Sequence, residues 1–256
     1  MSIKEKVLVF QELTNNAWPA KEYFFVYGWI LRFSNGFFSR ANSVLPLHYF
    51  GSDIEEDIHT VERIYRNKGL NVIFQIPDYT MPLNLDSKLE NLGYNIKSPT
   101  TVLVSVINTF RNIELLQEYN YTVSSDEIDR SWLNANHFFS NQTHEKRQAK
   151  EAIIGRISIP KKIYFTMRSD EKIVGVTLGV LERGILGIYS FVIDPKLRRK
   201  NLGSSLMNYV INWCRESSIY QIYLQVEKDN IPALGLYKKI GFQSIYSYHY
   251  RIKKIQ

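Results

Sequence analysis

The stretch Ile185-Leu186-Gly187-Ile188-Tyr189-Ser190-Phe191-Val192-Ile193 is followed by Asp194-Pro195 and then by Arg198-Arg199-Lys200-Asn201-Leu202-Gly203-Ser204. The apolar first part, rich in β-branched and aromatic residues, predicts a strand over 185–193. From Leu202 to Glu216, apolar residues recur at the spacing of one helix face, which predicts a helix docked on a sheet. A basic loop between a strand and a helix N-terminus can hold a pyrophosphate, because backbone N–H groups and partial positive charge meet there.

The C-terminal half around this stretch alternates strand and helix signals. Strands are predicted at Lys162–Arg168, Lys172–Leu181, Gln221–Val226 and Phe242–Ile252. Helices are predicted from a capping box at Ser124 and Glu127 to about Phe139, from Gln142 to about Ile154, and from the first turn around Pro232 to Gly241.

The N-terminal half repeats a similar order of elements. Strands are predicted at Trp29–Phe33 and Phe37–Val44 with an Asn35-Gly36 turn between them, a helix from the capping box of Ser52 and Glu55 to the stop at Gly69, a strand at Asn71–Ile76, a helix at Leu85–Leu92 and a strand at Thr100–Ile107. Leu92-Gly93-Tyr94 and Ile240-Gly241-Phe242 occupy the same place in each half. This self-similarity indicates a duplication.

The two halves differ at the anion loop. Where the C-terminal half has its basic loop, the N-terminal half reads Leu45-Pro46-Leu47-His48-Tyr49-Phe50-Gly51, without basic residues. We therefore predict a degenerate domain over residues 1–112 and a catalytic domain over residues 113–256, with a linker at about Asn108–Tyr119.

Composition limits the class of protein. Hydrophobic residues at 45% and charged residues at 22% are typical of a globular domain. No apolar run reaches the roughly 18 residues that span a bilayer, and no secretory segment is recognised, so we expect no membrane partner. The single cysteine, Cys214, is predicted to be a packed core thiol in a reducing compartment, which favours a cytoplasmic location.

Charge and histidine placement argue against two further classes. The net charge of +7 is spread along the chain, with local clusters at Lys196–Lys200 and Arg251–Lys254, so nucleic acid is an unfavoured partner. The five histidines are scattered, and His137 and His144 are predicted to lie at the surface, so no metal site is expected. The oligomeric state is left open between monomer and homodimer.

The loop and its neighbours carry a family resemblance. GNAT acetyltransferases have a loop of pattern Q/R-x-x-G-x-G/A, and this chain has Arg198-x-x-Asn201-x-Gly203. Asn replaces the first glycine, and Asn is the residue besides glycine that best tolerates positive φ. With Asn230 and Tyr237 following at the expected spacing, the segment Asp126–Lys253 resembles the GNAT superfamily, and the N-terminal half resembles the decayed copy of tandem GNAT proteins.

The resemblance implies a fold and a co-substrate. The fold is of the α/β class (an α+β mixed sheet), with two GNAT-like halves, each a central, mostly antiparallel sheet flanked by helices. The co-substrate is acetyl-CoA, which would donate its acetyl group to an amine. The residues implied to hold it are Phe191, Val192, Ile193, Arg198, Arg199, Lys200, Asn201, Leu202, Gly203, Ser204, Asn230, Ala233 and Tyr237.

The catalytic roles are also implied by the resemblance. Tyr237 would be the general acid for the departing thiolate, and Asn230 would contact the cofactor arm. The alternatives are a packing role for Tyr237 and a helix cap for Asn230. No carboxylate stands where many relatives keep their base: Gln225 takes one such position, so we expect proton removal through a water, oriented by Tyr189 or Tyr223.

Acceptor binding is predicted from the run Gly28 to Pro46, which resembles a group of bacterial tandem GNAT proteins. Arg40 and Asn42 would share one strand face and line an acceptor cleft, together with Tyr189 and Gln225. The alternative is a polar seam that joins the two halves.

Three functions remain in competition. The first is an acyl-CoA-dependent N-acyltransferase acting by direct attack in a ternary complex on a primary amine, which we expect to belong to a small molecule. The second is a non-catalytic acyl-CoA-binding module, suggested by the missing carboxylates, in which Tyr237→Phe changes no transfer. The third is an RNA-directed protein, for which affinity would depend steeply on salt.

Overall fold

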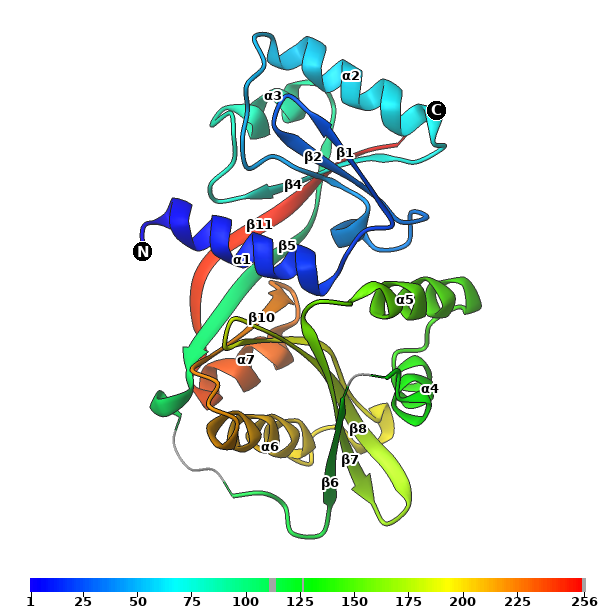
Figure 1. Cartoon of the computed structure of the whole chain (residues 1–256), viewed down its shortest axis with the longest axis vertical. Coiled ribbons are helices and arrows are strands. Elements are labelled where there is room, and N and C mark those ends of the chain that lie inside the picture. The colour runs from blue at the N-terminus through cyan, green and yellow to red at the C-terminus, as the bar shows by residue number, and fades with distance from the viewer. Residues whose placement is uncertain (111–113, 126, 255–256) are drawn as a thin grey trace. The chain divides into compact units, whose positions relative to one another are not determined.

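A computed structural model describes residues 1–110, 114–125 and 127–254. The chain divides into two compact units. Unit 1 comprises Met1–Thr101, Glu227–Asp229 and Ile245–Gln256, and unit 2 comprises Val102–Val226 and Asn230–Ser244. Each unit has strands covered by helices (Figure 1).

Unit 1 is built on a mixed sheet. Its elements are α1 (Ile3–Ala17), β1 (Glu22–Val26), β2 (Trp29–Phe33), the 3-10 helix η1 (Ser39–Ala41), β3 (Val44–Leu45), α2 (Ile54–Asn67), β4 (Val72–Pro77), α3 (Leu85–Asn91), and parts of β5 (Asn95–Val106) and β11 (Gln243–Lys253). The strands follow the order β1-β2-β3-β4-β11. All these pairs are antiparallel except β3 with β4.

The two faces of the unit 1 sheet differ in polarity. Phe74 and Ile76 belong to a core with Ile58, Val61 and Tyr65 of α2. Gln75 lies between them in β4, so it faces the other side, where its Nε2 donates to Gln11 Oε1 of α1 at 3.2 Å. Buried Arg32 joins this polar layer by donating from its Nη2 to Gln75 Oε1 and Ser43 Oγ, both at 2.7 Å.

Unit 2 holds the second set of strands. Its elements are the 3-10 helix η2 (Ile107–Thr109), β6 (Asn120–Ser125), α4 (Arg130–Phe139), α5 (His144–Arg156), β7 (Lys161–Ser169), β8 (Lys172–Glu182), β9 (Ile185–Ile193), the 3-10 helix η3 (Pro195–Leu197), α6 (Leu202–Glu216), β10 (Gln221–Glu227) and α7 (Ile231–Ile240). The strands follow the order β10-β9-β8-β7-β6, in which only β9 and β10 are parallel.

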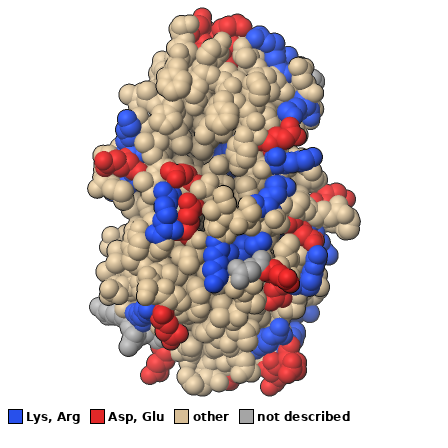
Figure 2. Space-filling model, in the orientation of Figure 1, with Lys and Arg blue, Asp and Glu red and all other residues tan. Residues whose placement is uncertain are grey.

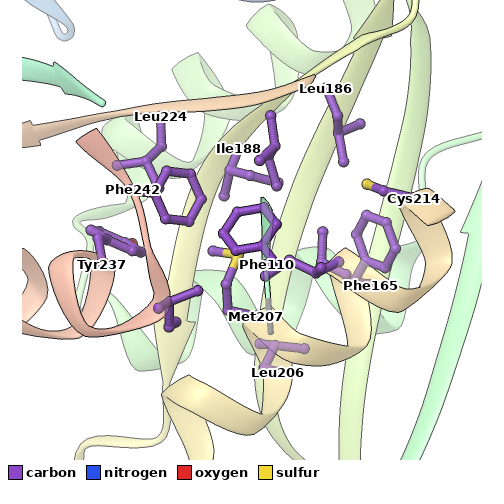
Figure 3. Close-up of a cluster of buried hydrophobic side chains, with 14 of the residues drawn as sticks. Phe110, Phe165, Leu186, Ile188, Leu206, Met207, Cys214, Leu224, Tyr237 and Phe242 are labelled. Atoms are coloured by element: carbon purple, nitrogen blue, oxygen red, sulfur yellow. The ribbon is translucent and has the colours of Figure 1, made fainter. Parts of the chain in front are cut away.

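The main core of unit 2 lies between the sheet and α6. Leu206 and Met207 of α6 pack against Leu186, Ile188 and the aromatic rings that Figure 3 shows around them. The opposite face of the sheet packs against α4, whose Trp132 donates from Nε1 to the Thr177 carbonyl of β8 at 3.1 Å. The strand order and the two helical coverings therefore place β9 in the interior of the sheet, between β10 and β8.

The predicted fold class is confirmed: the chain has a mixed sheet flanked by helices. The strands Trp29–Phe33 and Ile185–Ile193 and the helix Leu202–Glu216 have the bounds that the sequence predicts. The strands are mostly apolar and the helix has an apolar stripe on one face, so local sequence is enough to define these segments.

Several local predictions were wrong. The strand predicted over Phe37–Val44 is reduced to Val44–Leu45, because residues 39–41 form a 3-10 turn. The cap of α4 is Asp129, which accepts from Trp132 N, while Ser124 lies in β6. Similarly, Asp53 and not Ser52 caps α2. In both helices a nearby Asp takes the capping position that we assigned to Ser.

One α-helix and two strands were not predicted: α1, β1 and β6. The signal for α1 was present, because Ser2 and Glu5 form a capping box at its N-terminus. The predicted domain boundary between residues 112 and 113 lies outside the described residues. The last segment of the chain, Ile245–Gln256, belongs to unit 1.

Charged side chains of both signs are interspersed on the face in Figure 2. Within residues 1–110, 114–125 and 127–254, no helix combines the length and the apolar character that crossing a bilayer requires.

Candidate functional site

The loop between β9 and α6 enters the helix through a left-handed residue. Asn201 has φ 60° and ψ 7°, which confirms the positive φ predicted for this position, and Arg199 also has a positive φ of 63°. Asp194 holds the start of the loop by accepting from Lys196 N at 2.9 Å. Among the described residues, no side chain caps the N-terminus of α6. Its first backbone N–H groups thus remain available to an anion.

The residues of this loop present positive charge around the helix end. Arg198, Arg199 and Lys200 are exposed, and Leu202 is buried beneath them. A Cβ on Gly203 would lie 3.3 Å from Leu236 Cδ2, so the helix start is closely packed against α7. Gly203 and Ser204 are half-buried. The donor set of backbone N–H groups and three cations fits a diphosphate.

Strand β9 is bulged just before this loop. Val176 pairs with Val192, but Leu178 pairs with Tyr189, so Thr177 faces both Ser190 and Phe191. Ser190 has a positive φ of 51°. A bulge takes backbone groups out of the regular ladder and leaves them for another partner. Phe191 and Val192 are half-buried at this point, and Ile193 is buried.

Side chains that the sequence did not single out hold the bulge. Asn136 of α4 donates from Nδ2 to the Ser190 carbonyl at 2.8 Å, and Thr177 donates from Oγ1 to the Tyr189 carbonyl at 3.0 Å. Lys150 of α5 donates from Nζ to Asn136 Oδ1 at 2.8 Å. No sequence pattern identifies these residues, because their partners are 12 to 54 positions away along the chain.

Helix α7 carries the two predicted catalytic residues. Asn230 is the N-cap of α7, and its Oδ1 accepts from Ala233 N at 3.3 Å. The alternative prediction, that Asn230 caps a helix, is therefore confirmed. Tyr237 lies further along the helix, with its ring centroid 6.3 Å from that of Phe191 and 5.7 Å from that of Phe242. In Figure 3, Tyr237 lies beside Phe242 and Leu224.

The environment of Tyr237 keeps its hydroxyl protonated. Its side chain is buried, and burial raises the pKa of Tyr237 well above its usual value. No hydrogen bond to the Tyr237 hydroxyl is found within the described residues. A protonated, unengaged hydroxyl can donate to a ligand but is a poor base.

Tyr189 and Tyr223, the two tyrosines expected to orient a water, are hydrogen-bonded to each other. The hydroxyl groups of Tyr189 in β9 and Tyr223 in β10 lie 2.7 Å apart. They alternate with Ile188 and Leu224 of the α6 core, so they face the other side of the sheet. Gln225 is half-buried two positions after Tyr223, on the same face.

The predicted acceptor residues of unit 1 lie in the loop around η1. Asn42 Oδ1 accepts from Ser34 N at 2.6 Å and from Gly36 N at 2.9 Å, and its Nδ2 donates to the Phe38 carbonyl. These bonds engage the amide of Asn42 within its own loop. Arg40 is half-buried, and its charge acts on Tyr250. The acceptor role of both residues stays a prediction.

Two other sequence interpretations can be checked in unit 2. Cys214 is buried in the α6 core, as predicted. His137 was predicted at the surface, which is wrong: it is buried on α4, where burial lowers its pKa to about 4. Among the described residues, no group of three or more His, Cys, Asp or Glu side chains could hold a metal ion.

Comparisons with known proteins agree with this geometry. Residues 10–251 match the family described as "Probable histone acetyltransferase Rv0428c C-terminal". The Bacillus subtilis (strain 168) protein "Uncharacterized N-acetyltransferase YobR" is 27% identical over 250 residues, which cover 95% of this chain and 97% of that protein.

Solved structures share the fold. The "GCN5-related N-acetyltransferase from Kribbella flavida" has a TM-score of 0.72 at 12% identity, over 97% of this chain and 95% of that one. A "Tandem GNAT protein from the clavulanic acid biosynthesis pathway" has a TM-score of 0.62 at 10% identity, over 78% of this chain and 69% of that one. The family match covers nearly the whole chain and the neighbours share its architecture. The chain therefore belongs to the Rv0428c C-terminal family and is an N-acetyltransferase of the GNAT type.

Proposed function

We propose that unit 2 binds acetyl-CoA and transfers its acetyl group to a primary amine of a small molecule. The observation that carries this proposal is the uncapped N-terminus of α6 behind the left-handed turn at Asn201, next to Arg198, Arg199 and Lys200. The backbone N–H groups and the three cations match the charge of a CoA diphosphate. Unit 1 lacks a comparable basic turn after β3, so we propose one binding half and one degenerate half.

The acyl group would lie along the bulged part of β9. The pantetheine arm would run beside Phe191, Val192 and Ile193, whose backbone lies at the edge of the bulge. Asn230 and Ala233, at the start of α7, would contact the arm from the other side. This course brings the thioester toward Tyr237, whose ring lies next to that of Phe191.

The chemistry would be direct attack in a ternary complex. The amine nitrogen attacks the thioester carbonyl carbon, and the negative charge that develops on the oxygen needs a backbone N–H donor. The carbon–sulfur bond then breaks, and Tyr237 donates its proton to the thiolate. Such general-acid assistance typically contributes roughly 10²–10⁴-fold to the rate. The proton lost by the amine would leave through water, since no carboxylate stands at the position of Gln225.

A non-catalytic acyl-CoA-binding module is the second candidate. It is favoured by that same neutral Gln225 at a position where many relatives keep a carboxylate. In this case the chain would bind acetyl-CoA without turnover.

The experiment that separates these functions uses purified protein and radiolabelled acetyl-CoA with a cell extract divided into small-molecule and protein fractions. We expect label in the small-molecule fraction, and a large reduction with Tyr237→Phe. Label in the protein fraction alone would overturn the small-molecule acceptor and keep the enzyme. Binding of acetyl-CoA with no transfer to either fraction would establish the second candidate.

A further inference from the structure

The bulge in β9 is strained and is therefore held by its surroundings. Ser190 has a φ of 51°, in the left-handed region that is strained for a residue with a Cβ. Around it, three carbonyls accept from buried side chains: Tyr189 from Thr177, Ser190 from Asn136, and Thr177 from Trp132. Trp132 and Asn136 are four residues apart, on one face of α4.

Lys150 determines which way the Asn136 amide points. Asn136 is fully buried and Lys150 is 4% exposed. The ammonium of Lys150 can only donate, so Asn136 must turn its Oδ1 toward Lys150. Its Nδ2 is then directed at the Ser190 carbonyl.

This arrangement is maintained at a cost. Among the described residues no carboxylate pairs with Lys150, and burial lowers its pKa to about 8. An ammonium buried without a counter-ion destabilises a fold. The hydrogen bond from Lys150 orients the Asn136 amide, which in turn holds the Ser190 carbonyl of the bulge. This arrangement is consistent with a role of Lys150 in positioning the backbone of β9.

The Ser190 carbonyl and the Phe191 N–H belong to one planar peptide unit, in which the two groups point in opposite directions. Asn136 therefore sets the direction of the Phe191 N–H by holding the Ser190 carbonyl. We propose that Asn136 and Lys150 are positioning residues that aim the Phe191 N–H at the oxygen of the acetyl group. This inference rests on the proposed transfer from acetyl-CoA.

The test compares wild type with Asn136→Asp, Lys150→Met and the control Tyr164→Phe. An aspartate at position 136 keeps the pairing with Lys150 but cannot donate to Ser190. Lys150→Met keeps the length of the side chain and frees the amide to turn. Tyr164→Phe removes a buried hydroxyl that has no hydrogen-bond partner among the described residues, next to Trp132 at the same helix–sheet contact.

Activity is measured as release of CoA thiol from acetyl-CoA. The acceptor is the fraction of the cell extract that takes up label in the preceding experiment, or water. For Asn136→Asp we expect kcat to fall roughly 10- to 100-fold, the effect of a misplaced oxyanion donor. We expect a smaller fall for Lys150→Met and none for Tyr164→Phe. The Kd for CoA, which has no acetyl oxygen, stays unchanged in all of them. An unchanged kcat in Asn136→Asp would overturn the proposal. If Asn136→Asp does not fold, an unchanged kcat in Lys150→Met would overturn it instead.

A second measurement does not depend on turnover. In protein labelled with ¹⁵N-phenylalanine, the Phe191 amide proton should move downfield with acetyl-CoA relative to CoA, and this difference should disappear in Asn136→Asp. If wild type shows the shift but transfers no acetyl group, the proposed enzyme fails and the positioning of Phe191 stands. If wild type is active and Phe191 does not respond, the positioning fails and the enzyme stands.

Discussion

The hydroxyl groups of Tyr189 and Tyr223 lie 2.7 Å apart, on the neighbouring parallel strands β9 and β10 of unit 2. Their rings meet edge to face, with centroids 6.3 Å apart. Gly187 makes this contact possible, because it pairs with Tyr223 and lies two positions before Tyr189 in β9. Any side chain at position 187 would occupy the space of the rings.

We predict that Gly187→Ala destabilises the protein by about 1–3 kcal/mol, the usual cost of overpacking. The new Cβ would lie 2.7 Å from the Tyr223 ring and hydroxyl and 2.8 Å from Tyr189 Cε2. Urea unfolding followed by fluorescence measures the change. Gly235→Ala is the matched control, since a Cβ there meets nothing within 4 Å. Equal stability of the two variants would contradict this account.

The left-handed turn at Asn201 predicts that substitution by glycine and substitution by alanine have different effects on stability and on the binding of acetyl-CoA. Its φ of 60° favours glycine, so Asn201→Gly should retain stability and binding of acetyl-CoA. Asn201→Ala should cost about 1 kcal/mol and weaken the binding of acetyl-CoA, because the loop must keep a left-handed residue without the tolerance of Asn. Thermal unfolding and the Kd of CoA report the two effects. A tighter Kd in Asn201→Ala than in Asn201→Gly would argue against the loop as the binding element.

Tyr237 should act as an acid at every pH at which the protein is folded. Because burial raises its pKa far above the usual value, the protonated form persists through the alkaline range. The rate of acetyl transfer should therefore show no loss from deprotonation of Tyr237 up to about pH 10, where a free tyrosine titrates. A pH profile of kcat tests this, with Tyr237→Phe lowering the rate roughly 10²–10⁴-fold throughout. A fall above about pH 9 that is absent in Tyr237→Phe would show that the hydroxyl titrates.

His137 should make the protein less stable at mildly acidic pH. Its pKa falls from 6.5 to about 4 in the folded protein, mainly through burial and then through the charges of Lys150 and Arg147. Between these values the unfolded chain binds a proton that the folded chain does not, so stability is present above pH 6.5 and is lost as the pH falls toward 4.

We expect His137→Gln to reduce the loss of unfolding free energy between about pH 7 and about pH 5, by on the order of 1 kcal/mol. Urea unfolding at the two pH values gives this difference directly. His144→Gln on α5 is the control, since that side chain is exposed. The same pH dependence in both variants and in wild type would mean that His137 does not carry the effect.

Cys214 should react with thiol reagents only after unfolding. It is fully buried, and burial raises its pKa to about 12. At about pH 8 the thiolate fraction is then on the order of 10⁻⁴. Labelling with a disulfide reagent should be slow in buffer and rapid in denaturant. Rapid labelling of the folded protein would indicate that the α6 core opens easily.

Much of the fold of unit 2 follows from local sequence. Strand 185–193 and helix 202–216 were predicted at their observed bounds, because a continuous apolar run and a helical stripe each satisfy one local rule. The left-handed turn at Asn201 was also predicted, since few residues other than glycine accept that φ. The capping residues were predicted less well, because Ser and Asp lie close together before both helices and compete for one position.

The tertiary structure alone decided the surroundings of the candidate site. Three hydrogen bonds join positions 14 to 54 residues apart in the sequence. They link Asn136 to the Ser190 carbonyl, Lys150 to Asn136, and the hydroxyl groups of Tyr189 and Tyr223 to each other. Such contacts depend on strand register and helix docking, and no local pattern encodes them. The sequence by itself determined the central strand, the helix and the left-handed turn of the anion loop, because these are properties of neighbouring residues. The packing of α4 on β9, with Lys150 of α5 donating to Asn136 of α4, decided where a buried amide and a buried cation support the bulge, because these contacts exist only after the helices dock.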